Sequence, residues 1–594
     1  MKDEMLQFIS NSGLVPFKGV SKSTHIMPEI HVGESKSESI FKTKEARAVF
    51  RRIRDRVAAE CVFEDSISVL SRFEPVADAQ VIAERRVFFD SIPTVSPVFL
   101  RKLREPRANW KLPYQAIIAV ADERLYSRLK ARKLPVLLLQ QRGELRSLEK
   151  YAVVYTIKGD EVSSWAREMD CAVEVGEEVV YPEQYVEELA LWSGVVHDLI
   201  LHRDEVGRID AELVVLLDQY SSALSIFGAG GEDKKPISRA ELEKVCLELN
   251  ASVRVQVKSL TLQGDALVAA LSSGTMPAEI KQIISRSIAG CGHSRALFVE
   301  ALPITIDEKE FERERGRLVQ QGIDSFVRQL KTHATLLSGV PAFVERLQTF
   351  LVYADFVCAL RASFDGSHAE LGVGKGLLMD ECSNMFLEKP EPITFFLDSQ
   401  IKCSIMTGAN SGGKTTLLEH IIQTITLAQM GLPIRGRVGI GVFDSVYYFA
   451  KNKGSTSKGA FETMLTQLAG ISGGMGTLIL ADEMEAVTEP GVAAHIIAST
   501  CSYFMSKGCY LVIATHLGEE IITHLPSGAR VDGISASGLD ADMNLMVCHN
   551  PVLGQLANST PELIVERLAT LKKKEYFIHL HTQLKSISKE KIKK

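Results

Sequence analysis

A glycine-rich stretch that ends in a lysine and two threonines is the part of this sequence best suited to chemistry. Residues 408–415 read GANSGGKT and match the pattern G-x-x-x-x-G-K-[ST] at every fixed position. Glycines in such a turn let backbone N–H groups converge on phosphate oxygens, the lysine adds a positive charge, and the threonine hydroxyl can bind Mg²⁺. The pattern predicts a nucleotide-phosphate site that comprises Gly408, Ala409, Asn410, Ser411, Gly412, Gly413, Lys414, Thr415 and Thr416.

The segments on either side fit this prediction. Residues 401–406, IKCSIM, have the composition of a strand, and residues 415–430 are expected to form a helix with a buried face. The start of that helix would direct its positive end at the same anion. Gly431 and Pro433 then end the helix in the expected order.

Two further apolar strands end in residues that suit nucleotide hydrolysis. TLILADE ends at Asp482 and Glu483, where the aspartate would hold Mg²⁺ and the glutamate would orient the attacking water. CYLVIATH ends at Thr515 and His516, and the histidine is placed where a γ-phosphate sensor is expected. Taken alone, a strand that ends in acidic residues or in histidine is commonly structural, so these roles depend on the glycine-rich turn upstream.

Between the first two motifs lies the segment NKGSTSKGAFETMLTQLAGIS. Ser457 or a neighbouring hydroxyl can cap a helix here, and a capped helix start is also an anion site. The segment follows Lys414 by only about 45 residues, whereas an ABC transporter usually inserts a sizeable helical subdomain before its corresponding motif.

Composition limits the classes of protein to which this chain can belong. The chain has 594 residues, 46% of them hydrophobic and 24% charged, which is ordinary for a soluble globular protein of about four domains. Its net charge of −6 gives no bulk signal for nucleic acid, so any such binding must use local patches. The ten cysteines are scattered, the N-terminus lacks the apolar core of a signal peptide, and no apolar run could span a bilayer. A cytoplasmic protein is expected, associated with the nucleoid if the source is prokaryotic.

The pattern along the chain predicts an ordered series of regions. A small α/β unit with a parallel sheet is expected around AIIAVA and LPVLLLQ, and a region of long helices follows it. Such helices suit levers, although a compact helical bundle would give the same pattern. The expected regions are a flexible lead (1–40), the start of a helical core (41–112), the small α/β unit (113–182), the helical region (183–368), the nucleotide-binding domain (369–560), and a C-terminal helix with a basic tail (561–594).

These motifs resemble those of the MutS family of DNA-handling ATPases. The resemblance rests on TGANSGGKTT, STSKGAFETM, LILADEMEAVTEPG and VIATHLGEE, and it extends back to TKEARAVFRRI and forward to GQLANSTPELIVERLA. It implies an ABC-type α/β P-loop ATPase domain at the C-terminus, joined to a region of lever and clamp helices with a small inserted α/β unit. It also implies a homodimer that binds DNA and uses ATP with Mg²⁺, each nucleotide lying between one protomer and its partner.

The resemblance implies a role for each motif residue. Lys414 would bind phosphate, Thr415 and Asp482 would bind Mg²⁺, and Glu483 and His516 would be the catalytic pair. Phe386, in NMFLEK, stands where the family places an aromatic residue that stacks on adenine, although a core phenylalanine explains it equally well. Ser457, Lys458 and Gly459 would begin the helix that reaches the partner's nucleotide.

Three departures from the family pattern limit these expectations. Only about 40 residues precede the helical core, and they lack the wedge motif of mismatch-recognising members, so direct mismatch sensing is not expected. Gly459 and Ala460 precede Phe461 where the family has Ser-Thr, so the contact with the partner's phosphate would use backbone amides or Ser457. The segment EAVTEP is similar to the non-mismatch branch, and the short remaining chain predicts no nuclease domain.

The leading hypothesis is a homodimeric, DNA-stimulated ATPase that clamps DNA in mismatch-related repair or in recombination. Its phosphate contacts would come from lysines and arginines such as those of FLRKLREPRANWK (99–111) and FRRIRDR (50–56), which implies recognition of DNA structure rather than sequence. The alternative is an ABC-type ATPase module of a protein complex that does not itself bind DNA. An SMC-type ATPase is disfavoured because no sustained heptads are present.

Overall fold

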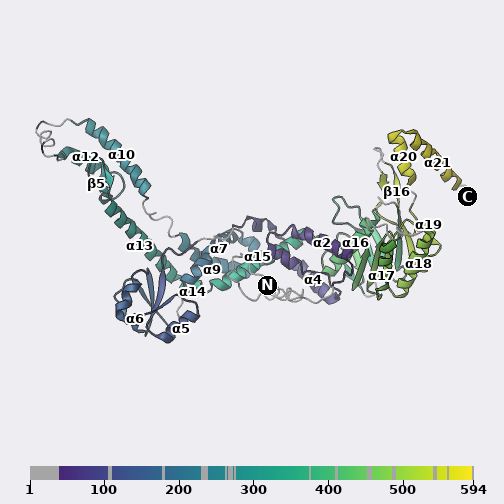
Figure 1. Ribbon diagram of the computed structural model, residues 1–594, viewed down its shortest axis with the longest axis horizontal. Helices are drawn as coiled ribbons and strands as arrows, with labels where there is room; N and C mark the ends of the chain where they lie inside the picture. Colours follow the sequence, from purple (N-terminus) through teal and green to yellow (C-terminus); the bar gives the residue numbers. More distant parts are fainter. Residues whose placement is uncertain are drawn as a thin grey trace. The chain divides into compact units, whose positions relative to one another are not determined.

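The structure is a computed structural model. It describes residues 39–104, 110–176, 181–228, 238–260, 264, 272, 274, 276–372, 376–408, 413–450, 458–484, 490–539, 545–557 and 561–591. These residues form two compact units, coloured by sequence in Figure 1. The first unit comprises the described parts of Met1–Arg101, Arg208–Asp210 and Gln348–Lys594, and the second comprises those of Lys102–Gly207 and Ala211–Leu347.

The main sheet of the first unit has six strands in the order β12-β13-β14-β10-β15-β18. All are parallel except β18, which runs antiparallel to β15. The strands are β10 (Cys403–Gly408), β12 (Ser445–Phe449), β13 (Thr477–Asp482), β14 (Tyr510–Ala514), β15 (Ala529–Ile534) and β18 (Val552–Leu553). The central strands are continuous apolar runs, as expected for a parallel sheet covered on both faces.

Helix α16 (Lys414–Met430) covers one face of this sheet and is itself covered by a second, four-stranded sheet. That sheet has the order β7-β11-β8-β9 and comprises β7 (Glu370–Leu371), β8 (Leu377–Cys382), β9 (Ile393–Leu397) and β11 (Arg437–Ile440). Every residue of α16 from His420 onward is buried, including Gln423 and Gln429. The Gln429 side chain donates to Val76 O and Phe443 O at 2.9 and 2.8 Å, which compensates for its burial.

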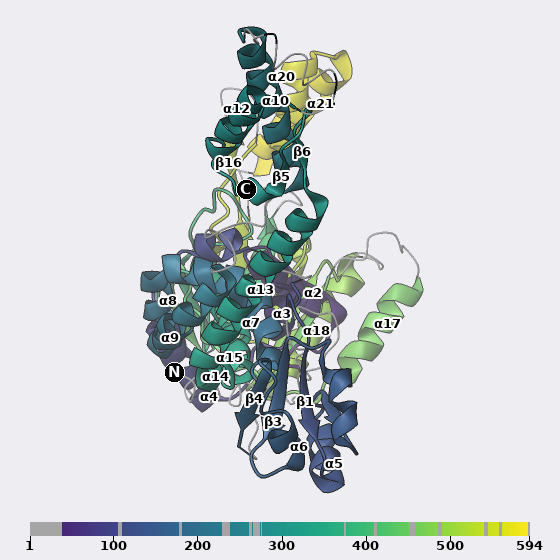
Figure 2. The ribbon, with the colours of Figure 1, turned by 90° about the vertical axis from the view of Figure 1, so that its left-hand side faces the viewer.

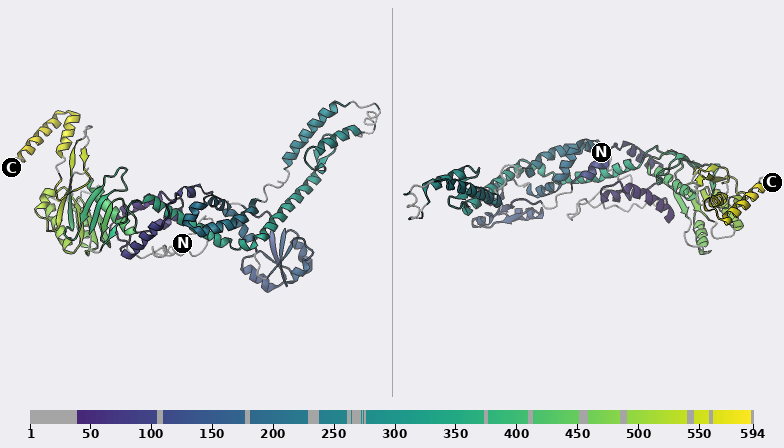
Figure 3. Two further views of the ribbon diagram at one scale, coloured as in Figure 1. Left: turned by 180° about the vertical axis from the view of Figure 1, so that it is seen from behind. Right: turned by 90° about the horizontal axis from the view of Figure 1, so that it is seen from above.

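The other face of the main sheet is covered by three helices, visible in green in Figure 1. They are α17 (Lys458–Ala469), α18 (Pro490–Ser506) and α19 (Gly518–Ile522). The first unit is completed by α2 (Lys44–Ala58), α3 (Glu64–Leu70), α4 (Ala79–Ser91), the end of α15 (Val340–Ser363), the strands β16 (Ala536–Leu539) and β17 (Leu545–Val547), and the C-terminal helices α20 (Pro561–Lys572) and α21 (Glu575–Lys591), drawn in yellow in Figure 3.

Helix α2 begins at the Thr43 cap and buries the apolar face that its sequence predicts. Ala46, Val49, Phe50, Ile53 and Val57 are buried on that face, and α2 packs against α16. Thr43 also accepts a hydrogen bond from Tyr448 N of β12, at 3.0 Å, through its side chain. The helix is thereby attached directly to the main sheet.

The second unit contains the small parallel sheet that the sequence predicts, in the order β2-β1-β3-β4. Its strands are β1 (Ala116–Val120), β2 (Val136–Leu138), β3 (Val153–Ile157) and β4 (Ala172–Val175). Helices α5 (Glu123–Ala131) and α6 (Glu161–Trp165) and the 3-10 turn η2 (Arg142–Leu148) connect them, as Figure 2 shows for β1, β3, α5 and α6.

The helical pattern of residues 185–228 is divided among three helices. They are α7 (Glu183–Leu201), α8 (Arg203–Ile209) and α9 (Ala211–Gly228). His202 ends α7 because its backbone, at φ −110° and ψ 31°, leaves the helical range. Since α7 packs against α9, the apolar residues along this stretch bury one another within the unit.

A further cluster in the second unit joins helices that Figure 3 shows running alongside one another. Its elements are α10 (Arg239–Lys258), α12 (Ala278–Ala289), β5 (Phe298–Val299), β6 (Thr305–Ile306) and α13 (Glu308–Thr332), and the short α14 (Ala334–Leu337) follows. Helix α10 begins with a capping box formed by Ser238 and Glu241. Among the described helices, none is long and apolar enough to cross a membrane.

Candidate nucleotide-binding site

The carboxyl ends of three neighbouring strands bring the motif residues to one edge of the main sheet. Gly408 ends β10, Asp482 ends β13, and His516 follows β14 by two residues. In the register of the sheet Asp482 lies beside Ala514, and Ala514 lies beside Met406. Parallel strands therefore place motifs that are far apart in the sequence within contact distance.

Two sets of polar contacts hold these residues at the edge. Thr415 Oγ1 donates to Asp482 Oδ2 at 2.5 Å, and His516 Nε2 lies 3.1 Å from Glu483 Oε1. Lys414 Nζ lies 3.3 and 3.4 Å from the two ring nitrogens of His516 and donates to Gly408 O. Lys414 and Asp482 are 3% and 5% exposed, so their charges act in a surrounding that screens them less than water does.

Glu483 is held in a strained backbone conformation. Its φ of +52° lies in the left-handed region, which residues other than glycine rarely adopt. Its N–H donates to Ala514 O at 2.8 Å, which continues the sheet pairing by one residue and fixes this turn. Strain of this kind is commonly found at functional sites, and here it directs the glutamate side chain toward His516.

Two glycines shape the turn into α16. Gly413, the N-cap of α16, has a φ of +92° and offers no side chain to the N–H groups of the first helical turn. Gly408 has a φ of +133°, and a Cβ added to it would lie 2.4 Å from Ile534 O. Because that gap excludes any side chain, the turn before α16 can approach the neighbouring strand β15 only through a glycine.

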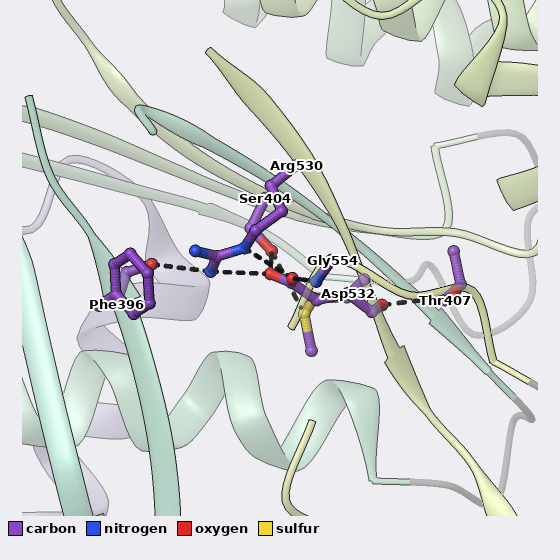
Figure 4. A network of polar contacts seen from close by, with 7 residues as sticks. Phe396, Ser404, Thr407, Arg530, Asp532 and Gly554 are labelled. Atoms are coloured by element: carbon purple, nitrogen blue, oxygen red, sulfur yellow. Dashed lines mark hydrogen bonds and ion pairs between the residues drawn. The ribbon is translucent and has the colours of Figure 1, made fainter. Parts of the chain in front are cut away.

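A buried carboxylate fixes the strand that carries the turn, as Figure 4 shows. Asp532 of β15 is fully buried and accepts hydrogen bonds from Ser404 Oγ at 2.6 Å, Arg530 Nε at 2.7 Å and Gly554 N at 2.9 Å. Thr407, directly before Gly408, donates through its hydroxyl to Asp532 O at 3.2 Å. These contacts compensate for the cost of burying the carboxylate and hold the end of β10 against β15.

The oxygen atoms at this edge fit a magnesium ion. The Thr415 hydroxyl and the Asp482 carboxylate are hard oxygen donors that already converge to hydrogen-bonding distance. Mg²⁺ prefers such donors and is usually held by one or two protein groups, with phosphate oxygens and water completing its coordination. Thr415 and Asp482 are therefore the residues that would hold the ion.

Some predicted residues lie outside the described residues. These are Ala409, Asn410, Ser411, Gly412 and Ser457. Of the other predicted residues, Lys458 and Gly459 begin α17, and Thr416 lies half-buried in the first turn of α16.

Phe386 lies in the loop between β8 and β9, and it is half-buried beneath the guanidinium group of Arg52, which lies 4.2 Å from the ring centroid. Its N–H donates to Asn384 Oδ1 at 2.9 Å. The aromatic ring is therefore held by a residue of α2 on one side, which the sequence did not indicate.

His549 is a residue at this site that the motif analysis did not single out. A Cβ added to Gly413 would lie 3.0 Å from His549 Nδ1, so the imidazole faces the start of α16. The His549 N–H donates to Glu391 Oε2 at 3.2 Å, and the next residue, Asn550, accepts from Thr394 N at 2.9 Å. No motif surrounds this histidine, so only the folded chain reveals its position.

The fold and the motif together define the class of this domain, a P-loop ATPase domain of the ABC type. Comparison with known proteins then narrows the class. The chain is 28% identical over 577 residues to the DNA-binding protein MutS2 of Pyrococcus furiosus, covering 88% of this chain and 96% of that protein. It is 24% identical over 396 residues to the Endonuclease MutS2 of Listeria innocua, covering 64% of this chain and 47% of that protein.

A third relative, the Endonuclease MutS2 of Acetivibrio thermocellus, is 24% identical over 287 residues, which cover 45% of this chain and 34% of that protein. The chain therefore matches about half, or less, of the length of these bacterial relatives. No protein-family model matches the chain. The chain is thus similar to MutS2 proteins, in agreement with the resemblance that its motifs carry.

Proposed function

We propose that this protein is a homodimeric ATPase that clamps DNA and uses ATP binding and hydrolysis to move its long helices, in DNA repair or recombination. The observation that carries the proposal is that Thr415 contacts Asp482 at the sheet edge where His516 contacts both Glu483 and Lys414. Such a group of residues at the end of parallel strands suits phosphoryl transfer to water, which needs positioning and charge more than covalent chemistry.

In this proposal each residue has a defined task. Lys414 and the N–H groups at the start of α16 bind the β- and γ-phosphates, whose charge they neutralise. Glu483 accepts a hydrogen bond from the attacking water and orients it, while His516 holds the Glu483 carboxylate and senses the γ-phosphate. Thr415 and Asp482 hold Mg²⁺, which, when bound, stabilises negative charge that develops on the phosphate oxygens.

A second protomer would complete the site. Helix α17 begins at Lys458, and the N–H groups of its first turn suit a phosphate presented by a partner chain. Ser457 and Gly459 would flank that phosphate. This arrangement would make ATP binding close the dimer, because the nucleotide bridges the two chains.

The DNA assignment is supported by a relative whose printed name is DNA-binding protein MutS2. It is also supported by helix α5 and the turn after it, where Arg124, Arg128, Lys130, Arg132 and Lys133 are exposed. Cations spaced along one helix suit the phosphate backbone of nucleic acid, so we expect recognition of DNA shape and a steep dependence on salt.

The alternative is an ATPase module that serves a protein complex and does not touch DNA, which the net charge of −6 favours. ATPase rates measured with and without duplex and branched DNA, together with the mass in solution, separate the two. A dimer stimulated by DNA, with binding that weakens steeply as salt rises, supports the proposal. A monomer whose ATPase does not respond to DNA contradicts it.

A further inference from the structure

Two arginines on one side of α2 reach the loop that carries Phe386. Arg52 stacks on the Phe386 ring with its guanidinium carbon 4.2 Å from the centroid, and its Nη1 lies 2.6 Å from Glu419 Oε2 of α16. Arg56, one helical turn further on, donates to Met385 O. The two guanidinium groups therefore hold consecutive residues of the same loop.

Helix α16 holds this loop from its other side. Gln423 lies one turn beyond Glu419, and its Oε1 accepts from Met385 N at 3.2 Å. Asn384, only 3% exposed, accepts the Phe386 N–H at 2.9 Å. Arg56 of α2 and Gln423 of α16 thus each bind one backbone group of Met385, which restricts the orientation of the neighbouring aromatic ring.

The same helix α16 begins at Lys414, the residue proposed to bind phosphate. The loop and the phosphate-binding turn are therefore attached to one rigid element, with Glu419 a single turn beyond Thr415. A flat aromatic ring held at a fixed position relative to the phosphates is what the base of a nucleotide needs for stacking.

We propose that Arg52 and Arg56 are positioning residues that hold Phe386 as the platform for the nucleotide base, so that α2 forms part of the base-binding side of the site. This inference rests on the proposed function, because it assumes that ATP binds at Lys414. It gives the α2 arginines a role different from contact with DNA phosphate, since the Arg52 guanidinium is already engaged by Phe386 and Glu419.

The inference predicts a loss of base binding without a loss of phosphate binding. We would measure dissociation constants for ATP and for inorganic tripolyphosphate, both with Mg²⁺, on the full-length chain. For Arg52→Ala we expect about 5-fold weaker ATP binding, the size of a lost cation–π and ion-pair contact, and unchanged tripolyphosphate binding. In steady state the KM for ATP should rise by about the same factor while kcat stays near the parental value.

Matched variants sharpen the test. Lys44→Ala removes an exposed cation from the same helix, outside the stretch 50–56, and should leave both constants unchanged. Arg52→Lys keeps a charge for Glu419 but loses the planar group over Phe386, so an intermediate affinity for ATP is expected. Phe386→Ala should weaken ATP at least as much as Arg52→Ala, and the double variant should be no weaker than Phe386→Ala alone.

Several outcomes would overturn the inference. Equal weakening of ATP and tripolyphosphate would indicate a general disturbance of the site, and parental affinity for both would show that Arg52 does not act there. Weaker DNA binding with an unchanged KM for ATP would assign the arginines to DNA. A failure of the proposed function itself gives a different result, since Lys414→Ala would then bind both ligands as the parent does.

Discussion

The protein contains two parallel sheets whose carboxyl edges differ in one respect. In the small sheet, α6 begins behind Asp160, and the Asp160 carboxylate accepts hydrogen bonds from Ala121 N at 3.0 Å, Asp122 N at 3.1 Å and Val162 N at 2.9 Å. In the main sheet, α16 begins behind Gly413, which has no side chain, and its first residue is Lys414. One edge is filled by the protein's own anion, whereas the other has a lysine and a helix whose N-cap residue carries no side chain.

The comparison shows that a parallel sheet does not by itself provide a nucleotide site. Both edges have backbone N–H groups between strand and helix, the feature that binds anions in such folds. At β1 and β3 those groups are already satisfied by Asp160. The small unit has no glycine fingerprint, and the Asp160 carboxylate already accepts hydrogen bonds from the N–H groups at this edge. An external phosphate would therefore have to compete with a carboxylate of the protein itself.

The largest expected effect is at the main sheet. Lys414→Ala should weaken ATP binding by about 100-fold or more, since a buried cation in contact with His516 is removed from the phosphate-binding turn. Isothermal titration with ATP and Mg²⁺ measures this. Asp160→Ala is the matched control in the other sheet and should bind ATP as the parent does. If Lys414→Ala kept parental affinity, the two edges would not differ in the way described.

The next prediction concerns the small sheet. Asp160→Ala leaves the N–H groups of Ala121, Asp122 and Val162 without their acceptor, so the second unit should lose about 1–3 kcal/mol of stability. Added phosphate should restore part of that loss, because the opened edge then resembles an anion site. Hydrogen exchange of β1 and β3 with and without phosphate measures both effects. Glu161→Ala, which changes an exposed neighbour, should respond to neither.

Acid should lower the stability of the first unit and raise that of the second, and His420 determines the effect in the first. Burial lowers the pKa of His420 on α16 to about 4, below its ordinary 6.5. The folded state therefore excludes a proton that the unfolded state binds, and stability is lost as pH falls from 6.5 toward 4, by about 2 kcal/mol at pH 5. His420→Gln should flatten this dependence, which hydrogen exchange in α16 would report. A parental profile that is already flat would contradict the assignment.

The smallest effect is expected in the second unit. Burial raises the pKa of Glu183, which accepts hydrogen bonds from Tyr155 at 2.8 Å and Tyr114 at 3.3 Å. The folded state holds this proton more tightly than the unfolded state, so stability is full at low pH and falls as pH rises above the ordinary carboxyl range. Exchange rates in β3 between pH 5 and 8 test the sign, and Glu183→Gln should remove the slope. If the stability of the parent protein rose with pH over this range while that of Glu183→Gln did not, the assigned direction of the Glu183 pKa shift would be wrong.

The sequence predicted the parts of this molecule that depend on local pattern. The buried face of α2, the strand before Gly408 and the parallel strands of the small sheet all follow from apolar periodicity. Periodicity also located Asp482 and His516 at strand ends, and the sheet brings those ends together.

Features that depend on contacts between residues far apart in the sequence could not be predicted from local patterns. Helix α16 is buried on nearly every side because a second sheet covers it, whereas its sequence alone indicated a single buried face. The contact between Arg52 and Phe386 joins residues more than 300 positions apart, and His549 reaches Gly413 from an unmarked loop. The break of residues 185–228 into three helices depends on how α7 packs against α9, which composition does not encode.

In the proposed mechanism Glu483 orients water for an ATP molecule held at Lys414. ATP binding and single-turnover hydrolysis, measured on the same samples of the parent protein and Glu483→Ala, test this role directly. We expect Glu483→Ala to bind ATP with parental affinity and to hydrolyse it at a rate at least about 100-fold lower. Hydrolysis by Glu483→Ala at the parental rate would contradict it.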